Sequence, residues 1–179
     1  MKLFSISLLS LVIVLGTSCS SKVGTQVKEP FSGKAYTSNA KYFRAVGKGV
    51  SSRDQVAASK ADIEAHKELA QQVATNIQVV TDAYAQDVQG EHVNEAVERF
   101  ETLAREITNT TIADLRKIGE KKFMQDDGNY AVFVAYEIKK SAMFRFMKKL
   151  AKQKTDISPL ARTQIMKMCD EEIERLEGE

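Results

Sequence analysis

Several residue types are scarce in this 179-residue chain, which has no tryptophan, two prolines, two cysteines and two histidines. Its charge is also nearly balanced, because 26 Lys and Arg side chains stand against 24 Asp and Glu side chains. A net charge this small gives no general electrostatic preference for nucleic acid. We therefore expect no nucleic-acid partner.

The shortage of histidine and cysteine limits the chemistry that the sequence can support. Neither His66 nor His92 has a partner at metal-ligand spacing, and no Gly-x-Ser-x-Gly elbow, Cys/His pair or zinc motif is present. His66 falls on the charged side of a predicted helix, so a surface position is expected. We expect no catalytic residue, no metal and no cofactor, and therefore a protein that is not an enzyme.

An apolar run over residues 3–15 follows a short charged start, Met1-Lys2. The run is too short for the roughly 20 residues of a membrane-spanning helix. It is followed by Gly16, Thr17 and Ser18, and this order of charged start, apolar core and small residues is typical of an export signal. Residues 1–18 are therefore predicted to be a signal peptide.

Cys19 comes directly after the small residues, and this arrangement resembles a bacterial lipoprotein signal, although Gly16 stands where such signals usually carry leucine. The resemblance implies that Cys19 is acylated, anchors the mature chain in a lipid bilayer and leaves Cys169 without a disulfide partner. The absence of aspartate after Cys19 implies the outer membrane. The alternative is an ordinary secreted protein, in which an exposed Cys19 thiol would tend to cross-link.

The segment after Cys19 is rich in Ser, Lys, Gly and Thr and shows no sustained periodicity. We predict that residues 19–40 form a flexible tether. A coil of about twenty residues would span roughly 25 Å on average and hold a folded domain just off a bilayer.

The stretch from Tyr42 to Val80 is predicted to organise the fold, with a strand at 42–50 followed by a long amphipathic helix at 53–80. Ser52 and Gln55 have the spacing of a capping box at the start of the helix. Gly47 and Gly49 lack the further motif of a nucleotide-binding loop, so they indicate a strand bulge or a close contact between helix and strand. The apolar side chains expected on one face of this helix are Ala58, Ala61, Ala65, Leu69, Val73, Ile77 and Val80.

Further along the chain, a polar break over residues 81–90 precedes a second amphipathic helix at 91–107. Residues 108–125 are predicted to form either one strand with a bulge at Gly119 or two short strands. After a turn, the strand at 130–138 is apolar on both faces, which is typical of a central strand. Either the C-terminal helices or another protomer should cover its second face.

The C-terminal part is predicted to hold two helices of opposite charge. The helix over residues 140–154 carries only basic charges, and a second helix starting at Ser158-Pro159 is mainly acidic. Two interpretations are open: the basic helix Lys139–Lys154 contacts anionic lipid headgroups, or the two charged faces are solvated and attract each other across a helical hairpin.

The strand with its Ala-Val-Gly-x-Gly sequence, the alanine-rich helix after it and the later hairpin resemble the twenty-kilodalton outer-membrane lipoprotein family of Gram-negative bacteria and related flagellar-ring accessory domains. The residues that carry the resemblance in the helix are Ala57, Ala58, Ala61, Ala65, Leu69 and Ala70. It implies an α+β lipoprotein domain over residues 41–140, with a small antiparallel or mixed sheet, the two amphipathic helices packed on it, and a C-terminal helical extension at 141–179.

The function implied by this resemblance is a structural or assembly role in the cell envelope, on the periplasmic side of the outer membrane. The partners would be the lipid bilayer, through acylated Cys19, and envelope proteins or further copies of the chain. The alternative is a periplasmic binding module that takes an envelope glycan or a small molecule in a pocket between sheet and helices.

Overall fold

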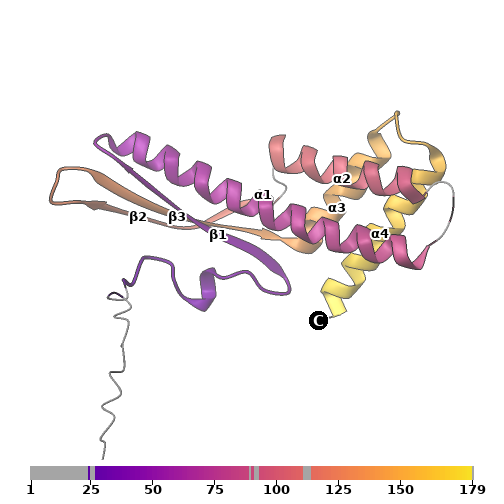
Figure 1. Cartoon of the computed structure of the whole chain (residues 1–179), viewed down its shortest axis with the longest axis horizontal. Coiled ribbons are helices and arrows are strands. Elements are labelled where there is room, and N and C mark those ends of the chain that lie inside the picture. Colours follow the sequence, from indigo (N-terminus) through magenta and orange to yellow (C-terminus); the bar gives the residue numbers. More distant parts are fainter. Residues whose placement is uncertain (1–23, 25–26, 89, 91–92, 111–113, 179) are drawn as a thin grey trace, which may run out of the picture.

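A computed structural model of the chain describes residues 24, 27–88, 90, 93–110 and 114–178. It places a small sheet at one end of an elongated molecule and helices at the other (Figure 1). The elements are η1 (Lys34–Tyr36), β1 (Tyr42–Ser51), α1 (Asp54–Asp87), α2 (Val93–Thr110), β2 (Arg116–Met124), β3 (Tyr130–Lys139), α3 (Lys140–Gln153) and α4 (Pro159–Gly178). The predicted α+β class is confirmed. Within the described residues, none of these helices has the length and hydropathy to cross a membrane.

The sheet has three antiparallel strands in the order β1-β3-β2, so the prediction that residues 130–138 form the central strand is confirmed. β2 shifts register between Lys117 and Gly119, close to the predicted bulge. The hairpin between β2 and β3 turns through Gly128, whose φ of 80° is a conformation that glycine adopts without steric cost.

α1 lies on β1 at backbone contact distance. A Cβ added to Gly47 would stand 1.9 Å from the carbonyl oxygen of Ala61, and one added to Gly49 would stand 2.0 Å from that of Ala57. Ala57, Ala61 and Ala65 are fully buried against the strand. Of the two interpretations of Gly47 and Gly49, the structure confirms the close helix-on-strand contact.

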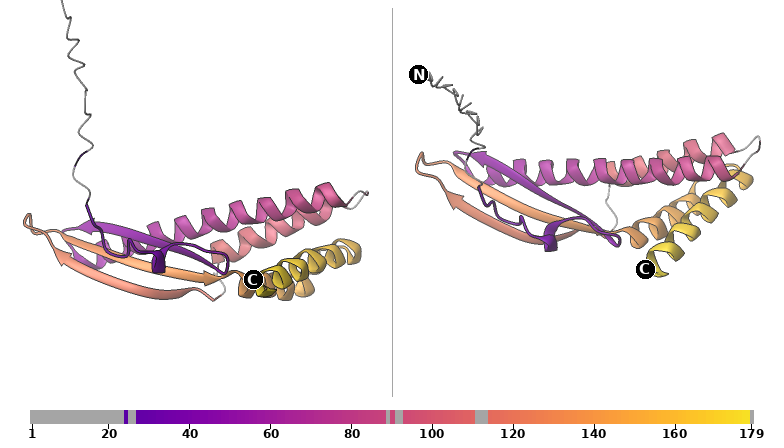
Figure 2. Two further views of the ribbon diagram at one scale, coloured as in Figure 1. Left: turned by 90° about the horizontal axis from the view of Figure 1, so that it is seen from below. Right: turned by 60° about the horizontal axis from the view of Figure 1, so that its bottom comes forward.

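The buried stripe of α1 winds around the helix instead of staying on one face. As far as Ile77 its members follow one another at intervals of four residues, and each such step advances the stripe by about 40°, because an α-helix turns about 100° per residue. From Ala57 to Ile77 the stripe therefore rotates by about 200°. The first part contacts the sheet and the second part contacts the other helices (Figure 2). The buried residues are Ala57, Ala61, Ala65, Leu69, Val73, Ile77, Val80, Thr81 and Tyr84.

The start of this helix lies within one residue of the predicted position, whereas its predicted C-terminal end and its predicted cap are wrong. The predicted break at 81–90 is helical as far as Asp87, since Thr81 and Tyr84 continue the buried stripe. At the other end, the N-cap is Arg53 and no side chain caps the helix. The predicted capping box is therefore absent, although an Asp54 carboxylate in the first turn suits the positive end of the helix dipole.

α2, α3 and α4 pack with the second half of α1 into a helical end beyond the sheet. α2 contacts α1 and α4. The prediction that α2 packs on the sheet is therefore wrong. α2 extends to Thr110, so the predicted strand at 108–125 begins only at Arg116. The start of α4 is as predicted, because the Ser158 hydroxyl accepts a hydrogen bond from the Ala161 amide at 3.2 Å.

The second face of the sheet is covered by the segment at residues 27–41, which we call the strap. It lies on the side of the sheet away from α1 (Figures 1 and 2). The ring of Phe31 stands where a Gly119 side chain would be. Neither the C-terminal helices nor a second protomer is needed to cover this face. The predicted flexible tether at 19–40 is wrong for residues 27–40, which are docked on the sheet.

We expect Gly47→Ala to destabilise the fold, because the new methyl group would overlap the Ala61 carbonyl of a helix held in place along its whole length. Overpacking of this kind typically costs about 1–3 kcal/mol. Urea unfolding followed by circular dichroism measures the loss. Gly33→Ala is the matched control, since a Cβ there meets nothing within 4 Å. Equal stability of the two variants would contradict the close contact.

Candidate functional site

The residues singled out from the sequence do not converge on one site. Cys19 and His92 lie outside the described residues. His66 lies on α1, with its imidazole 4.9 Å from the Tyr136 ring. Within the described ranges, no group of three or more His, Cys, Asp or Glu side chains is placed to hold a metal ion.

His66 is half-buried rather than exposed on the surface, so the prediction for this residue is wrong. Its Nε2 atom is buried and has no hydrogen-bond partner within the described part of the chain. Next to it, the Tyr136 hydroxyl donates a hydrogen bond of 2.8 Å to Asp62. Lys117 of β2 completes the cluster, with its Nζ 2.9 Å from Glu120 and 3.7 Å from Asp62.

The electrostatics of this cluster favour a structural role. Burial, and then the hydrogen bond to Asp62, raises the pKa of Tyr136. The hydrogen bond with Glu120 raises the pKa of Lys117. Tyr136 therefore stays protonated and Lys117 stays charged at neutral pH, so neither is an activated nucleophile or base. The cluster joins the middle of α1 to β2 and β3 through these hydrogen bonds and ion pairs.

The strap is the feature that the sequence analysis missed. Its first half is held by packing, because the Phe31 ring lies 4.8 Å from the Tyr36 ring and next to Gly119. The backbone of Phe31 has a φ of 61°, a left-handed conformation that costs a bulky residue about 1–2 kcal/mol. Glu29 adds an ion pair of 2.6 Å to Lys48 of β1.

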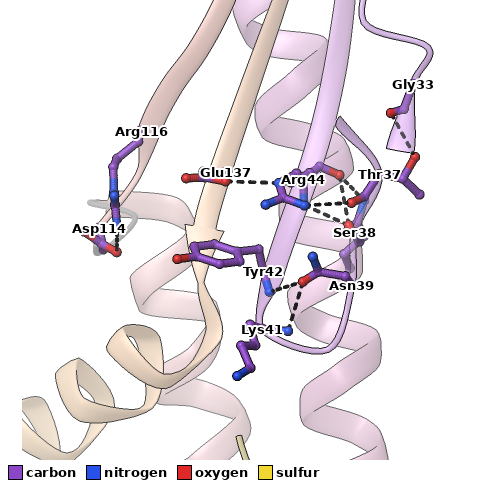
Figure 3. Close-up of polar contacts among 11 residues, drawn as sticks. Gly33, Thr37, Ser38, Asn39, Lys41, Tyr42, Arg44, Asp114, Arg116 and Glu137 are labelled. Atoms are coloured by element: carbon purple, nitrogen blue, oxygen red, sulfur yellow. Dashed lines mark hydrogen bonds and ion pairs between the residues drawn. The ribbon is translucent and has the colours of Figure 1, made fainter. Parts of the chain in front are cut away.

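The second half of the strap is held by a set of hydrogen bonds that we call the clasp, formed by Thr37, Ser38, Asn39, Arg44 and Glu137 (Figure 3). The Ser38 hydroxyl accepts a bond of 2.8 Å from the Arg44 amide. The Arg44 guanidinium donates to the Thr37 carbonyl at 3.1 Å and to the Glu137 carboxylate at 3.0 Å. The Asn39 side chain accepts from the amides of residues 41 and 42.

Burial makes the centre of the clasp sensitive to change. Arg44 and Glu137 expose only 14% of each side chain, so removing either would leave a largely buried charge without its partner. The clasp also reaches α1, because the Ser38 hydroxyl lies 2.6 Å from the Gln72 side-chain oxygen and Gln72 donates to the Arg44 carbonyl at 3.0 Å. Strap, sheet and long helix thus meet at one point.

A groove of about 720 Å³ opens beside the clasp, between the edge of β1 and α1. Most of its exposed lining is apolar, and the polar side chains that line it include Ser38, Arg44, Glu68, Gln72, Thr75 and Asn76. Asn76 and Val79 also line a second hollow of about 430 Å³ between α1 and α4. The side-chain oxygen of Asn76, where the two meet, is buried and has no hydrogen-bond partner among the described residues.

Three basic side chains in and just after α3 are paired with carboxylates of α4 and α2. Arg145 and Lys148 of α3 form ion pairs with Glu177 and Asp170 of α4. Lys154, just after α3, pairs with Glu106 of α2 at 2.7 Å. The interpretation that the basic and acidic helices attract each other across a hairpin is therefore confirmed.

Comparison with known proteins adds no assignment, because no protein-family model, curated protein or solved structure matches the chain. The resemblance to the outer-membrane lipoprotein family therefore stays a prediction.

We expect Ser38→Ala to loosen the strap, since it removes the hydroxyl that links the Arg44 amide to Gln72. The loss of such a hydrogen bond costs about 1 kcal/mol. Limited trypsin digestion measures this as faster cleavage after Lys34 and Lys41. Thr37→Ala is the control, because its hydroxyl makes only a 3.5 Å contact with the Gly33 carbonyl. Cleavage at the same rate in both variants would contradict the clasp.

Proposed function

We propose that this chain is a lipid-anchored lipoprotein of the bacterial outer membrane, facing the periplasm, with a structural or assembly role. The observation that carries the proposal is the position of Cys19, immediately after an apolar run and three small residues. Acylation there supports durable anchoring, since each buried methylene of an acyl chain contributes about 0.8 kcal/mol.

The shape of the described part supports a role through protein contacts. α1 alone has 34 residues and is about 51 Å long, so the helical end extends beyond the sheet. One of the two edge strands of the sheet, β2, is exposed and rich in lysine, which disfavours pairing with another strand. Partners, or further copies of the chain, would therefore bind at the helical end rather than at this edge.

We expect Cys19→Ala to release the protein from the membrane fraction, because the substitution removes the thiol that would carry the acyl chain. Fractionation of cells followed by immunoblotting measures the distribution. The control is Cys169→Ala, since burial raises the pKa of the Cys169 thiol to about 12 and keeps it unreactive. An unchanged distribution of Cys19→Ala would count against lipidation.

The groove beside the clasp, which has polar side chains set in a mainly apolar lining, favours a second candidate function, in which the domain binds an envelope glycan. Hydroxyl and amide side chains on one wall, with Arg44 and Glu68, suit the many hydroxyl groups of a sugar. Binding there is compatible with lipid anchoring.

The groove can be tested by titrating soluble peptidoglycan fragments into the protein in a calorimeter. We expect Thr75→Val to weaken binding about fivefold to tenfold, because Thr75 lines the groove and its hydroxyl oxygen, which donates to the Gln71 carbonyl, would no longer accept a hydrogen bond from a sugar. Thr163→Val, an exposed threonine on α4 outside the groove, should bind like the unmodified protein. If the unmodified protein releases no heat on addition of the fragments, the binding function is wrong.

A further inference from the structure

We propose that the strap-bearing face of the sheet lies against a bilayer surface that contains anionic phospholipid. This inference rests on the proposed anchoring through Cys19, and it adds the surface of the domain that meets the membrane. It follows from three features of the described residues: where the strap begins, which charges lie on its side of the sheet, and which apolar side chains are exposed there.

Because the strap is docked on the sheet, only a short segment connects the proposed anchor, Cys19, to the folded domain. Glu29 is already fixed to Lys48 of β1, so only residues 20–28 separate the fixed part from Cys19. Even a fully extended chain of this length spans no more than about 35 Å. The strap side is therefore the side that the anchor holds towards the bilayer.

Basic side chains gather on this side of the molecule. Lys28, Lys34 and Lys41 of the strap are exposed, and the described part of the chain offers them no ion-pair partner. Lys121 of β2 lies 5.8 Å from the centre of the Phe31 ring and lines the same hollow as Lys28. Lysines this close to anionic lipid each strengthen association about fivefold.

The opposite layer of the sheet end has no such excess of basic charge. On the part of α1 that lies over the sheet, Glu64 and Glu68 stand against Lys60 and Lys67. The carboxylates of Asp54 and Asp62 are paired with Lys122 and Lys117 of β2. An anionic surface would therefore attract the strap side more strongly than the outer side of α1. This asymmetry selects one orientation for the domain.

Exposed apolar side chains lie next to these lysines. Phe123 of β2 is 46% exposed. Side chains alternate between the two faces along a strand, and Tyr136 of β3 faces α1, where it bonds Asp62. Ala131, five residues earlier, therefore faces the strap side, and so does its register partner Phe123. Val27, at the start of the strap, is 78% exposed. Apolar side chains bordered by lysines are typical of surfaces that lie in the membrane interface.

Few carboxylates oppose this contact. Glu29 is neutralised by Lys48, and Asp114 by Arg116. Asp126 and Asp127 lie in the turn of the β2-β3 hairpin, at the end of the sheet rather than on its face. The basic helix α3 is a weaker candidate, because Arg145 and Lys148 already have carboxylate partners on α4.

The test uses the lipidated mature protein, reconstituted into vesicles of phosphatidylcholine alone or of equal parts phosphatidylcholine and phosphatidylglycerol. A water-soluble amine reagent labels lysines, and mass spectrometry gives the rate at each. We expect Lys28, Lys34, Lys41 and Lys121 to label several-fold more slowly on the anionic vesicles. Lys149 and Lys152, exposed on α3, should label at the same rate on both.

A matched pair of variants separates this face from net charge. Lys28→Gln with Lys34→Gln should weaken the contact about 25-fold and restore fast labelling of Lys41 and Lys121. Lys149→Gln with Lys152→Gln removes the same charge from α3 and should leave their protection intact. If both double variants lose protection equally, the proposed face is wrong.

The remaining outcomes are equally decisive. Equal labelling on both kinds of vesicle overturns the proposal, and protection that depends on protein concentration rather than on lipid shows a second copy on this face and overturns it too. The same digest gives the mass of the N-terminal peptide. An acylated peptide without lysine protection defeats only this inference, whereas a bare Cys19 thiol defeats the proposed function as well.

Discussion

The fold depends on how closely the backbone of α1 approaches β1. With glycine at 47 and 49 and alanine at 57, 61 and 65, no side chain larger than a methyl group separates helix from strand. This contact fixes the direction of a helix much longer than the strand beneath it. Beyond Ala65 the buried stripe of α1 consists of larger residues and turns around the helix, so the half of α1 that extends beyond the sheet packs on α2 and α4 with a different side. One helix thus runs through a single core whose composition changes along its length.

The strap covers the face of the central strand that α1 leaves uncovered. β3 is apolar on both faces, and α1 covers only one of them, so the sheet needs a second cover. Phe31 supplies it by occupying the space above Gly119, and the clasp around Arg44 locks the end of the strap to strand and helix. The cover is therefore the same segment that leads back to Cys19, which links the packing of the sheet to the position of the proposed anchor.

The sequence predicted the contacts that depend on local spacing and missed those that depend on distant residues. The paired glycines and spaced alanines indicated the close contact, and Ser158-Pro159 indicated the start of α4. The end of α1 was missed because Thr81 and Tyr84 become buried only in the packed helical end. The strap was missed because its Ser, Gly and Lys content is typical of linkers, although Phe31 and Tyr36 were a signal. Acylation of Cys19 is a prediction from sequence alone, and this residue lies outside the described residues.

Whether the strap is docked decides how the domain and its proposed anchor are connected. Amide hydrogen exchange of the mature protein, read residue by residue, tests this most directly. We expect the amides of Tyr36, Tyr42 and Arg44 to be protected, since each donates a hydrogen bond within the strap or to its side chains. Exchange of all three at the rate of an unstructured peptide, with β3 still protected, would show that residues 27–41 are a free tether and would contradict the docked strap.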